Sequence, residues 1–152
     1  GGAGWWRVRR KGVTPERVHG AEAAGLGGDA ILRIVGLLEE RALRDLRELA
    51  SRYRMATLVE VHDASELETA LASGAEIVGV NNRNLHTFDV SLDTSLQLAA
   101  KIPASVVKVS ESGIHSRADV ARLAVSGYQA FLVGEHLMKS ADPSAALREL
   151  RS

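Results

Sequence analysis

Short apolar runs rich in β-branched residues alternate with segments of helical period along most of the chain, and this alternation restricts the fold more than any other feature. The runs that we expect to be strands are Ala30–Val35, Thr57–Val61, Glu76–Val80, Ser105–Val109 and Ala130–Val133. The flanking segments that we expect to be helices are Pro15–Ala24, Glu39–Tyr53, Asp63–Ser73, Leu92–Lys101, Arg117–Val125 and Pro143–Leu150. Such alternation predicts β-α-β units and a parallel sheet.

Two architectures fit this pattern, the doubly wound open sheet and the (β/α)8 barrel. The length of 152 residues favours the open sheet, because a barrel typically needs about 250. The polar residues at the ends of the expected strands favour the barrel, because barrel enzymes build their sites there.

Charge and composition exclude several classes of protein. The 19 basic side chains are balanced by 19 acidic ones, whereas a general nucleic-acid binder needs a basic surplus. The chain has no cysteine, which excludes disulfides, thiol nucleophiles and cysteine-bearing metal sites. No apolar run approaches the roughly 20 residues of a membrane helix. We therefore expect a cytoplasmic protein that binds neither nucleic acid nor membrane.

The first 13 residues stand apart from the repeating pattern. Gly1–Gly4 is typical of a flexible leader, and Trp5–Lys11 places both tryptophans beside four basic residues. That combination fits a base-stacking platform, a membrane-surface patch or a strand with a disturbed sequence. We expect residues 1–13 to be a leader and a disturbed first strand, and residues 14–152 to form the folded domain.

Polar side chains follow nearly every expected strand, where parallel α/β folds gather their functional groups. Glu60 lies in the apolar run Leu58–Val61, where an inward carboxylate would be desolvated and would suit a general acid or base. The alternative is an outward carboxylate paired with an arginine. Asn81–Leu85 places three amides and Arg83 together, either to make a turn or to orient an oxygen-rich substrate.

Glycines follow the last two expected strands, in Glu111-Ser112-Gly113 and in Gly134-Glu135. Glycine lets backbone N–H groups approach an anion closely, and loops at these places form the usual phosphate site of barrel enzymes. Four histidines fall on separate loops with no i, i+4 pair, so we expect no metal site and interpret them as loop histidines. They are His62, His86, His115 and His136.

Four of these segments together resemble, in order and spacing, the indole-3-glycerol phosphate synthase family of tryptophan biosynthesis. They are Val59–His62, Gly79–Leu85, Val109–Ile114 and Phe131–Glu135. The resemblance covers about Asp29 to Leu150 and extends more loosely back to Val8. It implies an α/β fold, a partial (β/α)8 TIM-type barrel that runs from about the third strand to the eighth helix. About six parallel strands in sequential order are expected.

The resemblance also implies roles for individual residues. Glu60 corresponds to the family's general acid or base, and Asn81 to an amide that orients the substrate. Glu111 and Ser112 correspond to the pair that contacts the reacting part of the substrate. Lys11 matches a catalytic lysine, although Lys11-Gly12-Val13 stands where the family has Lys-Asp-Phe. The residues implied in substrate or phosphate binding are Arg83, Gly113, Gly134 and Glu135.

The implied reaction closes the ring of a carboxyphenylamino-deoxyribulose 5-phosphate with loss of carbon dioxide and water, and requires neither a metal nor an organic cofactor. The family's first two strands, with a second catalytic lysine and its partner glutamate, have no counterpart in the chain. We therefore expect weak or no activity from the chain alone. The alternative is a noncatalytic barrel fragment or engineered scaffold. Exposed sheet edges favour a homo-oligomer.

Overall fold

The computed structural model describes residues 30–34 and 38–151, and its elements alternate between strand and helix. The strands are β1 (Ala30–Ile34), β2 (Ala56–Val61), β3 (Ile77–Asn81), β4 (Val107–Glu111) and β5 (Ala130–Leu132). The helices are α2 (Glu40–Arg52), α3 (Ala64–Ala72), α4 (Asp93–Ala99), α5 (Arg117–Val125), α6 (Glu135–Lys139) and α7 (Pro143–Arg151). None of these helices is long and apolar enough to cross a membrane.

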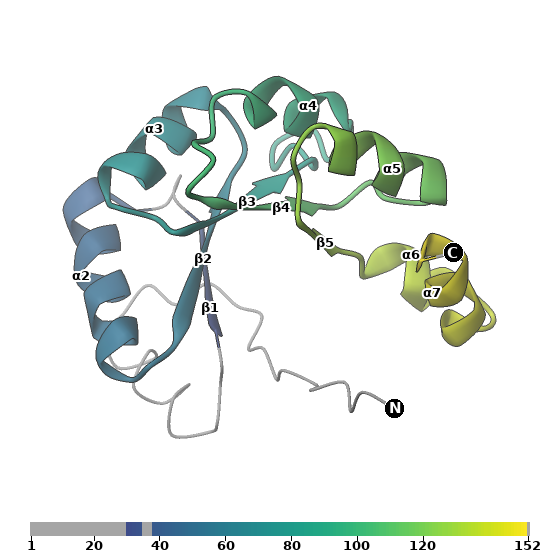
Figure 1. The fold of residues 1–152 in the computed structure, drawn as a ribbon, viewed down its shortest axis with the longest axis horizontal. Helices are drawn as coiled ribbons and strands as arrows, with labels where there is room; N and C mark the ends of the chain where they lie inside the picture. Colours follow the sequence, from purple (N-terminus) through teal and green to yellow (C-terminus); the bar gives the residue numbers. More distant parts are fainter. Residues whose placement is uncertain (1–29, 35–37, 152) are drawn as a thin grey trace.

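The strands form one parallel sheet in the order β1-β2-β3-β4-β5 (Figure 1). Every strand pairs with the next one along the chain, so the order has no reversal of the doubly wound kind. The described residues contain five strands rather than about six. The expected first strand and the expected helix Pro15–Ala24 lie outside the described residues. Sequential parallel strands joined by helices are the arrangement of a partial (β/α)8 barrel.

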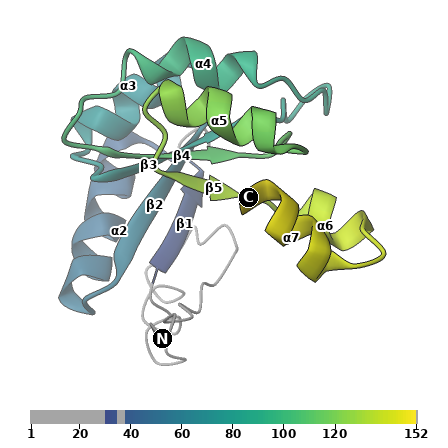
Figure 2. The same cartoon turned by 45° about the vertical axis from the view of Figure 1, so that its right-hand side comes forward.

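One face of the sheet packs against α2, α3, α4 and α5, which lie in an arc outside the strands, whereas α6 and α7 lie beyond β5 (Figures 1 and 2). Alternate strand residues point towards this helical layer. The fully buried ones in β2 and β3 are Val59, Val61, Val78 and Val80. Removing such a side chain from water contributes about 1.5–3 kcal/mol, so this layer is the main core of the described residues.

The opposite face of the sheet carries a smaller apolar cluster and the functional candidates. Leu58 and Val109 are buried in that cluster, with three partly buried neighbours: Ile77, Ala130 and Leu132. Residues two apart in a strand share a face. Glu60, Asn81 and Glu111 therefore lie on this face, beyond the apolar cluster at the carboxyl ends of β2, β3 and β4. Among the described residues no helix covers it (Figures 1 and 2), and we call it the helix-free face.

Most element bounds lie within one or two residues of the expected ones, and two differences stand out. Strand β4 begins two residues later than the expected strand Ser105–Val109, because Pro103 and Val106 close a turn with a 3.0 Å backbone hydrogen bond. Ser110 and Glu111 consequently belong to the strand and not to the following loop. Helix α6 was not predicted, since its five residues are too short for a periodic pattern.

Candidate active site

Two buried carboxylates and an amide meet at the carboxyl ends of three neighbouring strands. Glu60 and Glu111 are only 4% and 3% exposed. Asn81 pairs in register with Glu111, and its Nδ2 donates to Oε1 of Glu60 over 2.9 Å. Glu60 thus faces the helix-free side of the sheet and not an arginine on the outer side. An acidic group and an amide at this position are suited to moving and directing protons.

Gly79 provides the space for the second carboxylate. A Cβ atom at Gly79 would lie 2.0 Å from Oε1 of Glu111 and 3.2 Å from Cδ1 of Leu58. The position pairs in register with Glu60, so the Glu111 carboxylate reaches across β3 towards β2. The φ of Gly79 is not in the left-handed region, and the need for glycine here is one of space.

We predict that Gly79→Ala destabilises the protein by about 1–3 kcal/mol, because the added methyl group overpacks the site. In a Glu111→Ala background the same change is expected to cost less than about 1 kcal/mol, since the colliding carboxylate is gone. Urea unfolding of the four proteins measures this coupling. Gly134→Ala serves as the control, because a Cβ there would meet no atom within 4 Å. If Gly79→Ala lowers the free energy of unfolding equally with and without the Glu111 side chain, Glu111 does not occupy the space above Gly79.

A strained turn follows Glu111. Ser112 and Gly113 both adopt positive φ, at 66° and 73°. A Cβ at Gly113 would lie 2.5 Å from Cγ1 of Val90, so both the backbone and the space favour glycine there. The left-handed conformation of Ser112 is uncommon outside glycine and costs of order 1–3 kcal/mol, which the surroundings must offset.

Asn82 provides that support from the helix-facing side of β3. It is 2% exposed, and its Nδ2 donates to the carbonyl of Ser112 and to Oγ of Ser110, both over 3.0 Å. Its Oδ1 accepts from the N–H of Ser95 over 3.1 Å, close to the start of α4. The α4 N-cap residue, Leu92, makes no side-chain cap, so Asn82 caps the helix from a distance.

The network around Asn82 extends to a tyrosine. Ser95 and Ser110 share a 2.8 Å hydrogen bond between hydroxyls, and the Tyr128 hydroxyl donates to the carbonyl of Ser95 over 2.7 Å. Burial raises the pKa of Tyr128 to about 12, so the phenol remains a donor at neutral pH. These contacts lock the ends of β3 and β4 to α4.

Arg83 and Glu135 meet across the rim of the site, joining the loop after β3 to the start of α6. The Arg83 guanidinium forms an ion pair with Glu135, whose other oxygen accepts from Nζ of Lys139 over 2.6 Å. The hydrogen bond from Lys139 and the charges of Lys139 and Arg83 lower the pKa of Glu135. The backbone N–H of Arg83 donates to Oδ1 of Asn81 over 3.0 Å. Neighbouring Gly134 leaves open space above its Cα.

His62 is not the isolated loop histidine that the sequence predicted. Its ring lies between two carboxylates, with Nε2 3.4 Å from Glu60 and Nδ1 3.0 Å from Glu66. The neighbouring carboxylates, Glu60 first and then Glu66, raise the pKa of His62 to about 9. The Asp63 carboxylate caps α3 by accepting from the backbone N–H of Glu66. The Glu66 carboxylate in turn accepts from the backbone N–H of His62. The spacing Glu60-x-His62-x-x-x-Glu66 was the available signal, because it places both acids near the ring.

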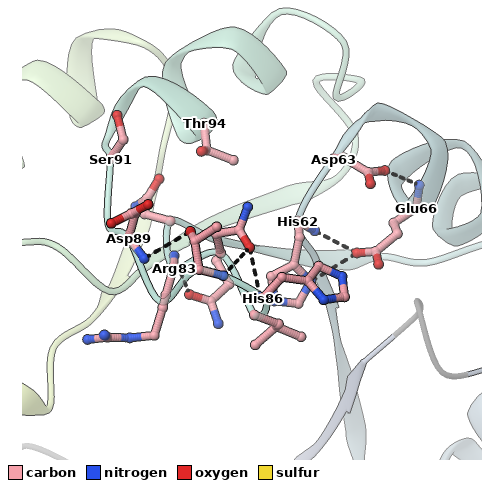
Figure 3. A pocket seen from close by; sticks show the side chains of 13 residues that line it. His62, Asp63, Glu66, Arg83, His86, Asp89, Ser91 and Thr94 are labelled. Atoms are coloured by element: carbon pink, nitrogen blue, oxygen red, sulfur yellow. Dashed lines mark hydrogen bonds and ion pairs between the residues drawn. The ribbon is translucent and has the colours of Figure 1, made fainter.

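A cavity of about 470 Å³ lies beside this group, above the ends of β2 and β3 (Figure 3). Its lining residues are all polar except Leu85, and most come from the loops before α3 and α4. It includes His62, Glu66, Asn81, Arg83, His86 and Asp89. In Figure 3 the Arg83 side chain extends away from His62 and Glu66.

The structure therefore brings together most of the candidates from three strand ends, with Ser112 and Gly113 in the adjoining turn. Gly134 and Glu135 follow β5, and Arg83 connects them to the group. Lys11 lies outside the described residues. Asn82, Gly79 and His62 are supporting residues. The sequence placed Asn82 only within the polar run Asn81–Leu85 and His62 only among the loop histidines, and it gave Gly79 no role.

Comparison with protein families gives one assignment over nearly the whole chain. A family model described as indole-3-glycerol phosphate synthase matches residues 8–150. The indole-3-glycerol phosphate synthase of Koribacter versatilis is 51% identical over 141 residues, covering 93% of this chain and 54% of that protein. The synthase of Albidiferax ferrireducens is 50% identical over 143 residues, covering 94% and 54%. The chain spans about half the length of the curated relatives it matches.

Solved structures agree on the fold. A structure titled native KDPGal matches with a TM-score of 0.63 at 16% identity, covering 91% of this chain and 61% of that one. A mandelate oxidase variant matches with a TM-score of 0.67 at 17% identity, covering 89% and 50%. At such identities these matches show a shared fold alone.

Proposed function

The chain belongs to the indole-3-glycerol phosphate synthase family, and from that premise we propose that it carries the C-terminal portion of a synthase active site. The proposed reaction is the decarboxylating ring closure of a carboxyphenylamino-deoxyribulose 5-phosphate, a lyase reaction. The observation that carries the proposal is the meeting of Glu60, Asn81 and Glu111 at the ends of three consecutive strands.

In the proposed reaction each of these side chains has a separate task. The Glu60 carboxylate transfers protons, and its hydrogen bond with Asn81 shows that it is already oriented. The Asn81 amide orients the substrate, and Glu111 with Ser112 contacts its reacting part. The lysine-type acid that polarises the ketone corresponds to Lys11, which lies outside the described residues.

The proposed phosphate site lies at the turns after β4 and β5. Gly113 is held in a left-handed conformation, and Gly134 has open space around it, so backbone N–H groups at both places can approach an anion. Glu135 contributes its backbone, while its carboxylate is engaged by Arg83 and Lys139. The proposed role of Arg83 is to contact the substrate next to Glu135, with which it forms an ion pair.

Anion binding by the chain tests the proposal without requiring turnover. On titration with inorganic phosphate, the amide signals of Gly113 and Gly134 are expected to shift in a saturable manner in ¹H–¹⁵N spectra. The amide of Gly127 is an internal control, because it precedes β5 at the opposite end of the sheet. No saturable shift at either Gly113 or Gly134 would contradict the proposed phosphate site.

The chain alone is expected to bind phosphate but to turn over substrate far more slowly than a complete enzyme, because it spans about half of its relatives' length. Complementation of a tryptophan auxotroph that lacks the synthase distinguishes an active chain from a noncatalytic barrel fragment. Loss of groups that orient the aromatic half of the substrate lowers the rate more than it lowers phosphate binding.

The proposal includes self-association of the chain. Within the described residues β1 and β5 are the edge strands of the sheet. Sheet edges of this kind favour pairing with another copy. Sedimentation velocity at micromolar concentration should show a dimer or larger species, and a monomer with cooperative unfolding would contradict this.

A further inference from the structure

The His62 ring lies between two carboxylates, one of which is the candidate proton-transfer group Glu60. Its ring nitrogens face Glu60 on one side and Glu66 on the other, at 3.4 and 3.0 Å. The side chain of His62 is 12% exposed and that of Glu60 is 6% exposed, so water screens this contact only slightly. Because Oε1 of Glu60 also accepts from Asn81, one oxygen joins the ring to the substrate-facing amide.

We propose that His62 is a positioning residue of the site. Its ring bridges Glu60 and Glu66 and so fixes the Glu60 carboxylate against Asn81, in the orientation in which Glu60 exchanges a proton with the substrate. The inference deepens the proposed function, on which it rests for the chemical role of Glu60.

The rest of the bridge is built to hold the ring in place. Glu66 accepts from the backbone N–H of His62 over 2.7 Å as well as from its ring, so the same carboxylate fixes both ends of the residue. Glu66 is itself fixed by the start of α3, where Asp63 caps its N–H. The contacts with Glu66 therefore fix the His62 ring against the start of α3, and the ring in turn contacts the Glu60 carboxylate.

The charge around the ring is predominantly negative. The ionisable groups come from its own strand, from the start of α3 and from the β3–α4 loop across the cavity. They are Glu60, Asp63, Glu66, Arg83, His86 and Asp89. Glu60 and Glu66 make direct contacts and raise the pKa of His62 to about 9, whereas the Arg83 guanidinium is paired with Glu135. The balance favours the charged ring at neutral pH.

Histidine titration by NMR on the full chain tests this inference. The His62 ring, assigned through backbone connectivity, is expected to titrate near pH 9. Glu60→Gln is expected to lower that midpoint by at least about one pH unit, because it removes an opposite charge beside the ring. Glu66→Gln should lower it in the same direction. Glu68→Gln is the matched control, because Glu68 is exposed on α3, and it should change the midpoint by less than about 0.3 unit.

A second readout tests the coupling to the site. In the parent protein the side-chain amide of Asn81 should shift with the same midpoint as the His62 ring, and this dependence should vanish in Glu60→Gln. A ring that titrates near 6.5, or an Asn81 amide that does not follow it, would overturn the inference. If Glu60→Gln fails to fold, Glu66→Gln still tests the coupling, because the midpoints of the His62 ring and of the Asn81 amide should fall together.

Neither readout needs substrate. If the chain titrates as expected but binds no phosphate, and an enzyme completed with the preceding part of a relative's sequence forms no product, the proposed function is refuted and the bridge is left intact. The converse result would refute the bridge alone.

Discussion

Glu60→Gln is expected to lower kcat by about 10²- to 10⁴-fold in an enzyme completed by joining this chain to the preceding part of a relative's sequence. The glutamine has the shape of the glutamate, and its Oε1 can still accept from Asn81 as the carboxylate does. The amide cannot take up a proton, however. The loss should therefore appear in kcat, with KM changed much less.

The matched control for this experiment is Glu68→Gln, which removes the same charge from an exposed position on α3. The kcat of Glu68→Gln is expected to stay within about twofold of the parent value, since water and salt screen an exposed charge from the site. Equal effects of the two substitutions on kcat would mean that net charge, and not proton transfer at Glu60, governs the rate.

Asn82→Leu is expected to destabilise the protein by about 3–5 kcal/mol. The substitution leaves the N–H of Ser95 and the carbonyl of Ser112 without their side-chain partner, and each such loss costs about 1–3 kcal/mol. It also removes the remote cap of α4. Against a total stability of roughly 5–15 kcal/mol this is a large fraction, and urea unfolding measures it directly.

Asn84→Leu provides the comparison for this substitution. Asn84 is exposed, and its Oδ1 accepts from the N–H groups of His86 and Thr87 within a surface turn. We expect a cost near 1 kcal/mol, because water can replace the lost partner. A cost below 1 kcal/mol for Asn82→Leu would show that the buried network does not support the turn at Ser112.

Much of the fold was predictable because the apolar pattern has the correct period. The valines of β2 and β3 alternate with residues of the opposite face, so Glu60 in an apolar run had to share a face with Leu58. The predicted bounds of α5 coincide with the observed ones, and in the structure a capping box at Ser116 marks its start. The strand order followed from the short connections.

The supporting residues were not predictable in the same way, because their roles depend on contacts between separate strands. Asn81 and Asn82 look equivalent in the sequence, yet one faces the site and the other faces α4. The space above Gly79 matters only because Glu111 reaches across from β4. His62 acquires its role from Glu66 on the following helix turn.

The most direct measurement of the central claim is turnover by the completed enzyme, followed by the fluorescence of indole-3-glycerol phosphate. We predict turnover when this chain supplies the C-terminal portion and the relative supplies the part that precedes it, and loss of that turnover with Glu60→Gln. A completed protein that unfolds cooperatively but forms no product, or one whose turnover survives Glu60→Gln, would contradict the account.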